Sequence, residues 1–141
     1  MSLLREERGI TLIEISVVLL MLGVAFGLTA PISRRIIARY ELNSAAQTLS
    51  SDLAYAKIHA IKSNSITVLR RETAREYRVD DRPRQLPSMV RFGEASVDSL
   101  GFNGLGATVD RGIQLLVLEN HFGERIEVRV YSSGGYQVQR L

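Results

Sequence analysis

The 141-residue chain contains no cysteine, which excludes a disulfide framework, a thiol nucleophile and a thiolate metal site. It also has little excess charge, because 18 basic side chains stand against 15 acidic ones and give a net charge of +3. A weak excess spread along the chain is a poor signal for nucleic-acid binding and favours a mixed, solvated surface. The sequence has no internal repeat and no low-complexity tract.

Residue sets that would support catalysis are also missing. Neither His59, on a predicted helix, nor His121, in a predicted turn, has an acidic residue or second histidine at metal-ligand spacing. No serine lies in a nucleophile-elbow context. The glycine-rich segment 100–106 does not follow the phosphate-binding spacing, so we expect a plain loop there. We therefore predict a protein that is not an enzyme and that uses no cofactor or metal.

What the chain does have is one long apolar run, residues 10–33, with a single acidic residue, Glu14. The run is long enough to span a bilayer, for which about 20 apolar residues suffice. A carboxylate in such a run is costly and is a functional hypothesis by default. The run is too long for a secretory signal core, and the candidate cleavage signal, Arg8-Gly9, precedes it. Basic residues flank both ends, so the charge-bias rule leaves the orientation undecided.

A second helical segment, residues 34–63, contains no glycine or proline. Its apolar residues recur at three- and four-residue steps, which predicts one buried helix face. The residues of this face are Leu42, Ala45, Ala46, Leu49, Leu53, Ala56 and Ala60. Because the face is rich in alanine, we expect a flat element such as a sheet to pack closely on it. Pro31 predicts a kink or weak point near residues 27–31.

After Ser63 the pattern changes to the alternation of β-strands. We expect strands at 65–69, 76–79, 89–92, 113–118, 125–131 and 136–141, with a polar loop at 80–87. The last three strands form an antiparallel meander through turns at 120–124 and 132–135. The fold class is therefore α+β, with the amphipathic helix packed on an antiparallel β-sheet domain, residues 64–141.

Three carboxylates, Glu119, Glu124 and Glu127, cluster around one predicted hairpin. On a strand, Glu127 faces the same side as Arg125 and Arg129. We expect this side to face outward and the cluster to be explained by cross-strand charge pairs.

The segment Gly9-Ile10-Thr11-Leu12-Ile13-Glu14, followed by an apolar helix with Pro31, resembles the type IV prepilin signature. The resemblance implies a leader, residues 1–9, that a membrane peptidase removes after Gly9. It also implies methylation of the new terminal amine at Ile10, where phenylalanine is usual in the family. Glu14 and Pro31 match the family's glutamate at the fifth mature position and proline at the twenty-second.

The rest of the chain resembles the GspH/FimT branch of minor pilins and pseudopilins, through residues 45–64 and the late hairpin. This implies a pilin-like fold: a transmembrane and assembly helix, 10–33, an amphipathic helix, 34–63, and the β-domain. It also implies a single-pass protein of the bacterial inner membrane with a periplasmic C-terminal domain. The implied partners are other pilins in a filament, the prepilin peptidase and methyltransferase, and the inner-membrane assembly platform.

The resemblance also supplies a partner for Glu14, the terminal amine of a neighbouring subunit. Ile10 and Glu14 lie about 6 Å apart along a helix at about 1.5 Å per residue, so an axial offset of that size aligns amine and carboxylate. A wrong register leaves both charges unpaired. The predicted function is a minor subunit of a type II secretion system or a type IV pilus. The choice between these machines, and between tip and shaft, stays open.

The alternative is a minor pilin that binds DNA during uptake. Seven arginines lie within residues 70–91, and the candidate DNA contacts are Arg70, Arg71 and Arg140. Four acidic residues interrupt the arginine stretch, and the final turn, which is often basic in this branch, keeps only Arg140.

Overall fold

The computed structural model describes residues 11–141, and for residues 28–32 it describes the backbone only. One helix, α1 (Leu12–Ser63), precedes all the strands. The strands described are β1 (Thr67–Arg71), β2 (Glu76–Val79), β3 (Arg82–Gln85), β4 (Val90–Phe92), β5 (Ser99–Phe102), β6 (Gln114–Asn120), β7 (Arg125–Val130) and β8 (Tyr136–Arg140). The chain divides into two compact units, Met1–Arg35 and Ile36–Leu141. The α+β class is confirmed.

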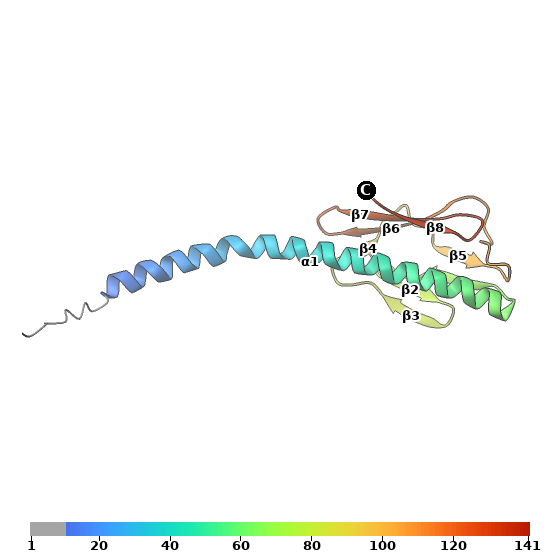
Figure 1. Cartoon of the computed structure of the whole chain (residues 1–141), viewed down its shortest axis with the longest axis horizontal. Helices are drawn as coiled ribbons and strands as arrows, with labels where there is room; N and C mark the ends of the chain where they lie inside the picture. The colour runs from blue at the N-terminus through green and yellow to red at the C-terminus, as the bar shows by residue number, and fades with distance from the viewer. Residues whose placement is uncertain (1–10) are drawn as a thin grey trace, which may run out of the picture. The chain divides into compact units, whose positions relative to one another are not determined.

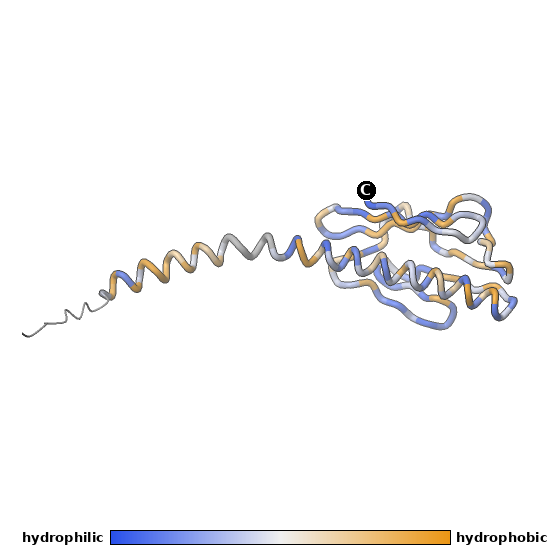
Figure 2. Tube along the Cα trace, viewed as in Figure 1, coloured by the Kyte–Doolittle hydropathy of each residue, from blue (hydrophilic) through white to orange (hydrophobic). Residues whose placement is uncertain are grey.

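The first unit contains the beginning of α1. Residues of hydrophobic character predominate along positions 11–27, as the hydropathy colouring of Figure 2 shows. Within the described residues, no helix combines the length and the apolar character needed to cross a membrane. The helix continues without a break through residue 31, so Pro31 does not end it. A kink at Pro31 stays a prediction, because the side chains of residues 28–32 lie outside the described part.

In the second unit, α1 is amphipathic, as predicted. All seven residues of the predicted apolar face are buried, and each is at most 4 % exposed. Ala38 extends the same face by one turn and is fully buried. Between these positions α1 shows polar side chains such as Asn43 and Gln47 to solvent. The three- and four-residue periodicity therefore identified the packed face of the helix correctly.

The strands form two four-stranded antiparallel sheets. The first sheet has the order β3-β2-β1-β5, and the second has the order β4-β6-β7-β8. Figure 1 shows β6, β7 and β8 on one side of α1 and β2 and β3 on the other. The predicted meander is confirmed as β6-β7-β8. The sequence did not indicate that β5 crosses back to pair with β1, which divides the strands between two sheets.

One hydrophobic core joins α1 to both sheets. The first sheet contributes large buried side chains, among them Leu69, Tyr77 and Phe102. The second sheet contributes Leu116, Leu118, Val128 and others. Because the helix face contains four alanines, both sheets can approach α1 closely. Burial of this shared apolar area is the main stabilising contribution.

Two segments predicted as loops contain strands. Residues 80–87 include β3, which is the edge strand of the first sheet and pairs with β2. An edge position tolerates Pro83, because the outer side of the strand needs no hydrogen-bond donor. Residues 100–106 include most of β5, where Leu100 and Phe102 are buried. Pro83 in β3 and Gly101 in β5 weaken the local strand signal, but pairing with β2 and β1 overrides this low propensity.

The expected outward position of Glu127 is wrong in one respect. Glu127 is only 7 % exposed. It lies in the central strand β7, between Val117 of β6 and Gln139 of β8. The segment Gly93–Ser96 runs beside β6 at this level, since Gly93 N–H and Ser96 Oγ both donate to the carbonyl oxygen of Val117. Glu127 pairs with Arg129 of the same strand, and the predicted cross-strand pairing is found between Glu119 of β6 and Arg125 of β7.

The turn before β8 requires glycine at position 134. Gly134 has φ of +74°, and a Cβ there would lie 1.8 Å from the carbonyl oxygen of Gly106. Lys57 of α1 donates its Nζ hydrogen to the carbonyl oxygen of Gly134 at 3.0 Å. This close approach holds the start of β8 beside the loop that follows β5.

Candidate functional site

The candidate assembly site begins at the first turn of α1. The backbone N–H of Glu14 donates to the carbonyl oxygen of Thr11 at 3.0 Å and to its Oγ1 at 3.3 Å. Thr11 is therefore the N-cap, and Glu14 stands at the third helical position, as in a capping box. A negative charge is favoured here because the helix dipole is positive at its N-terminus. The sequence pattern Thr-x-x-Glu carries this signal, and our sequence reading missed it.

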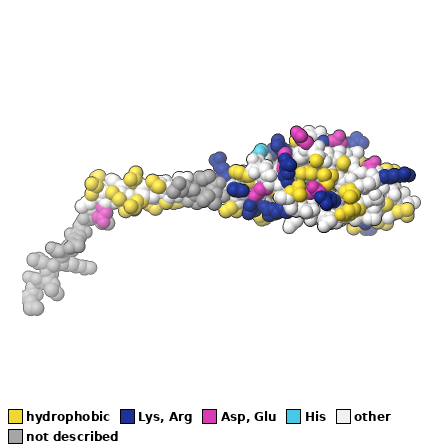
Figure 3. Space-filling view, turned by 90° about the horizontal axis from the view of Figure 1, so that it is seen from above, with side chains coloured by type: hydrophobic (Ala, Val, Ile, Leu, Met, Phe, Trp, Pro, Cys, Tyr) yellow, Lys and Arg dark blue, Asp and Glu magenta, His cyan; other side chains and the backbone are white. Residues whose placement is uncertain are grey.

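From Leu12 to Gly27, every residue of α1 is exposed. The large hydrophobic side chains around this segment are between 47 % and 84 % exposed, with Leu12 and Phe26 among the most exposed. Figure 3 shows that hydrophobic side chains dominate this stretch. A helix that is apolar on all sides is stable only when lipid or protein covers it. This surface therefore calls for a partner outside the described chain.

The predicted processing and assembly residues are placed only in part. Gly9 and Ile10 lie outside the described residues, and so does the side chain of Pro31. Glu14 is exposed, and in the described part of the chain its carboxylate has no partner. The structure thus places one of the four residues, at the start of the exposed apolar surface.

The candidate DNA contacts do not form one site. Arg70 and Arg71 lie on β1 of the first sheet, whereas Arg140 lies on β8 of the second. Arg71 pairs with Asp98, and Arg140 lies 3.9 Å from Glu124. Arg70 is exposed and is the only one of the three for which the described residues offer no carboxylate.

Most other arginines of the 70–91 stretch are also engaged. Arg78 pairs with Glu72 at 2.9 Å, and Arg91 with Glu119 at 2.8 Å. The guanidinium carbon of Arg82 lies 4.5 Å from the ring centroid of Tyr55. Salt bridges of this kind leave little unpaired positive charge for phosphates. DNA binding stays a prediction, and the observed placement of these arginines does not favour it.

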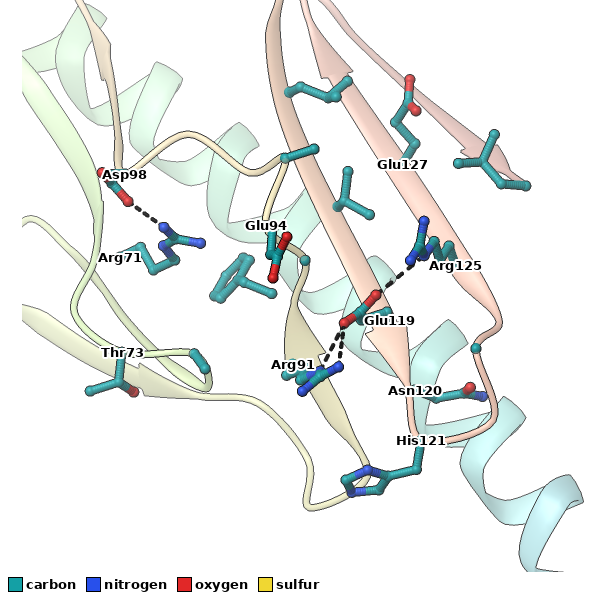
Figure 4. A pocket seen from close by; sticks show the side chains of 18 of the residues that line it. Arg71, Thr73, Arg91, Glu94, Asp98, Glu119, Asn120, His121, Arg125 and Glu127 are labelled. Carbon is teal, nitrogen blue, oxygen red and sulfur yellow. Dashed lines mark hydrogen bonds and ion pairs between the residues drawn. The ribbon is translucent and has the colours of Figure 1, made fainter.

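An open groove lies on the face of the second sheet away from α1 (Figure 4). It has a volume of about 1260 Å³, an apolar floor that includes Leu115 and Val117, and charged walls. Glu119 accepts from Arg91 on one oxygen and lies 3.2 Å from Arg125 on the other. Most charged groups of the groove are thus paired with one another, which favours a structural role for them over proton transfer.

The two histidines have different surroundings. His59 stacks on Tyr55 with ring centroids 5.6 Å apart, and its Nδ1 lies 3.2 Å from Thr67 Oγ1. His121 is exposed in the β6–β7 turn. Within residues 11–141, the side chains that can ligate a metal form no group of three or more.

A buried carboxylate, Asp52, is the polar residue that the sequence reading missed. It is 4 % exposed, accepts from Tyr77 Oη at 2.7 Å and accepts from Arg84 Nη2 at 3.0 Å. Burial raises the pKa of Tyr77, and the hydrogen bond to Asp52 raises it further. An acidic residue three positions after Leu49, on the apolar stripe, was the available signal. These bonds hold the β2–β3 hairpin against α1.

A second charged cluster joins α1 to the end of the second sheet. Arg39 Nη2 lies 2.6 Å from Glu124 Oε1, and Asn120 Nδ2 donates to Glu124 Oε2 at 2.9 Å. The hydrogen bond from Arg39, followed by that from Asn120, lowers the pKa of Glu124. The same pair raises the pKa of Arg39.

The arrangement of one long helix and two antiparallel sheets is similar to known structures. The type IV minor pilin FimU of Pseudomonas aeruginosa superposes with a TM-score of 0.62 and 16 % sequence identity, over 72 % of this chain and 90 % of FimU. A second crystal form of FimU gives 0.60 and 15 %, over 70 % of this chain and 92 % of FimU. The chain has a pilin-like fold. No family model and no curated protein sequence matches it.

The helix α1 of this pilin-like fold has two halves that differ in burial. The packed half of the helix belongs to the second unit, and residues 12–27 of the first unit are exposed. The likeness at this level of identity concerns the fold, and the function follows as a proposal.

Proposed function

We propose that this protein is a minor pilin or pseudopilin, a subunit of a helical filament in a type IV pilus or type II secretion system. The observation that carries the proposal is the exposed apolar half of α1, residues 12–27, attached to a pilin-like domain. Head-to-tail packing of such helices is a heterologous contact, which generates filaments rather than closed rings. The other subunits would cover the apolar surface that the domain leaves exposed.

The proposal includes processing and a membrane stage. A prepilin peptidase cuts after Gly9 and methylates the amine of Ile10. Before assembly, residues 10–33 anchor the subunit in the bacterial inner membrane with the domain in the periplasm, and an assembly platform then delivers it to the filament. The unbroken helix from Leu12 through residue 33 supports this stage, since it satisfies its own backbone hydrogen bonds.

Glu14 has a defined role in this proposal. Its carboxylate pairs with the terminal amine of an adjacent subunit, which sets the axial register. Its exposed position in the first turn of α1, with no partner for the carboxylate in the described part of the chain, supports this role. Mismatched registers would leave two charges unpaired in apolar surroundings.

The test compares Glu14→Val with Thr11→Val. Glu14→Val removes the carboxylate, and we expect processing to continue but incorporation into the filament to fall strongly. Thr11→Val removes only the capping hydroxyl, which costs about 1 kcal/mol of helix stability, so incorporation should remain close to wild type. Equal loss in both variants, measured by the amount of subunit in sheared filaments, would show that Glu14 acts only in capping.

Processing is tested separately with Gly9→Val. Bulk at this position should block cleavage, so the intact mass of the purified variant should retain residues 1–9. The wild-type protein from the same cells should lack them. A wild-type mass that still includes the leader would contradict the prepilin hypothesis, whatever the outcome of the Glu14 experiment.

A further inference from the structure

The second sheet ends in β8, which pairs with β7 on one side only. Backbone bonds from Tyr131 N–H to Gly135 O, 2.8 Å, and from Leu141 N–H to Arg125 O, 3.1 Å, flank the β7–β8 pair. Bonded and non-bonded residue pairs alternate in antiparallel strands. The backbone N–H and C=O groups of Tyr136, Val138 and Arg140 therefore point away from β7, toward the open edge.

The other edges of the two sheets are closed or blunted. Ala74 accepts a bond from Phe92 of β4, and Val109 donates to Gly101 of β5, both at 2.8 Å. The same alternation, counted from the bond of Leu86 N–H to Arg75 O, places Pro83 at the outward positions of β3. Proline offers no donor there, and natural sheets use it to prevent edge pairing.

The edge of β8 has no such protection. All five of its residues are exposed, and none is proline or lysine. Tyr136 and Val138, opposite Val130 and Val128 in β7, are 40 % and 45 % exposed. An exposed strand edge with apolar side chains is a template for another strand.

We propose that β8 accepts an extended strand from a neighbouring, different subunit of the filament, which continues the second sheet. This inference rests on the proposed filament function and specifies one of its contacts. The incoming strand places apolar side chains beside Tyr136 and Val138 and a carboxylate beside Arg140. Arg140 calls for a carboxylate because Glu124 is shared, lying 2.6 Å from Arg39 and 3.9 Å from Arg140.

A second copy of this chain fits the edge poorly. Antiparallel pairing of two β8 strands would turn the packed α1 segments of the two copies in opposite directions, which a filament with one polarity does not allow. In-register parallel pairing would set the two Arg140 side chains side by side, and like charges directly opposite each other are destabilising. The occupant is therefore a different chain.

The experiment uses the full-length protein in filament-producing cells. A photoreactive benzophenone amino acid is incorporated at position 139 of β8 or, as the matched control, at position 85 of edge strand β3. We expect irradiation to attach a strand of another pilin-like subunit at position 139, identified by mass spectrometry of the cross-linked peptides, with far less product at position 85. In the position-139 protein, Val138→Pro removes one outward donor, and the cross-linked product should fall about tenfold, as the loss of one hydrogen bond implies.

Two further variants separate edge pairing from folding. Val138→Thr keeps the backbone donor, and its cross-linked product should stay near the wild-type level. Val138→Lys keeps the donor but charges the apolar strip, so its product should fall even if Val138→Pro proves unstable. Equal cross-linking at positions 85 and 139, or products unaffected by Val138→Pro and Val138→Lys, would overturn the proposal.

The identity of the cross-linked product shows which chain pairs with β8. A product that consists only of two copies of this chain would overturn the choice of a different subunit. Normal incorporation into filaments without any product at position 139 would overturn the β8 contact alone. Loss of incorporation in Glu14→Val tests the proposed filament function separately, because it measures the amount of subunit rather than this contact.

Discussion

The two halves of α1 have the same secondary structure but opposite relations to the rest of the chain. From Leu12 to Gly27 every side chain is exposed, although most are apolar. Between Ala38 and Ala60 one stripe of apolar side chains is almost completely buried, while others off the stripe, such as Ile58, are exposed. An amphipathic helix can bury its apolar face against its own domain. A helix that is apolar on all sides is stable only when lipid or other helices cover it.

Two carboxylates on this helix show the same contrast. Asp52 is buried, and two partners from the domain, Tyr77 and Arg84, satisfy it. Glu14 is exposed at the first turn, where the backbone of Thr11 and the helix dipole are its local environment. Asp52 is therefore a structural carboxylate, whereas Glu14 is the carboxylate for which we propose a contact with another subunit.

The largest effect is expected when the same substitution is made in both halves of α1. Leu53 is fully buried, so Leu53→Ala should lower the free energy of unfolding by about 3 kcal/mol. Leu20 is 70 % exposed, so Leu20→Ala should change it by less than about 0.5 kcal/mol. Urea denaturation of the two purified variants measures both. Similar losses would mean that the apolar half also packs within the subunit.

The next effect concerns the buried carboxylate. Tyr77→Phe removes the hydroxyl donor to Asp52 and should cost about 1–3 kcal/mol. Because the folded pKa of Tyr77 is raised above its ordinary value of 10.0, its stabilising contribution is present below pH 10 and is lost as the pH rises further. The variant should therefore lose less stability than wild type between about pH 9 and pH 11.

Tyr40→Phe is the matched control, since Tyr40 lies on the same helix but is 74 % exposed. It should leave both the free energy of unfolding and its alkaline decline close to wild type. An alkaline decline that is unchanged in Tyr77→Phe would show that another group causes it.

The smallest effect concerns the exposed cluster of Arg39 and Glu124. The folded pKa of Glu124 is lowered, so its contribution is present above its ordinary pKa of 4.5 and is lost as the pH falls below that value. Glu124→Gln should reduce the decrease in melting temperature between about pH 6 and pH 3, a small change because the pair is solvated. Glu94→Gln, at an exposed position, should leave that decrease unchanged.

Much of the fold could be predicted because local patterns carry it. The buried face of residues 42–60 and the three strands of the meander follow from spacing alone. The strands β3 and β5 could not be predicted in the same way. Pro83 and Gly101 weaken the local strand signal, and only pairing with β2 and β1, respectively, makes these segments strands.

The candidate site divides similarly. The capping of α1 by Thr11 and the exposure of the apolar half were within reach of the sequence, because both depend on neighbouring residues. The pairing of the arginines could not be predicted from the sequence. Arg84 meets Asp52 across 32 positions, and Arg91 meets Glu119 across 28, so a stretch that resembled a basic surface is largely neutralised by distant carboxylates.

Spacing along the sequence is enough to predict a helix with an apolar half and an amphipathic half, followed by antiparallel strands. Periodicity is a local property, and it directs side chains to one face or to all faces regardless of what lies beyond. The division into two sheets, the burial of Asp52, and the contrast between the blunted edge of β3 and the open edge of β8 arise only in the folded chain. Each of these depends on which distant segments meet, because burial, charge pairing and free strand edges are properties of the packed chain.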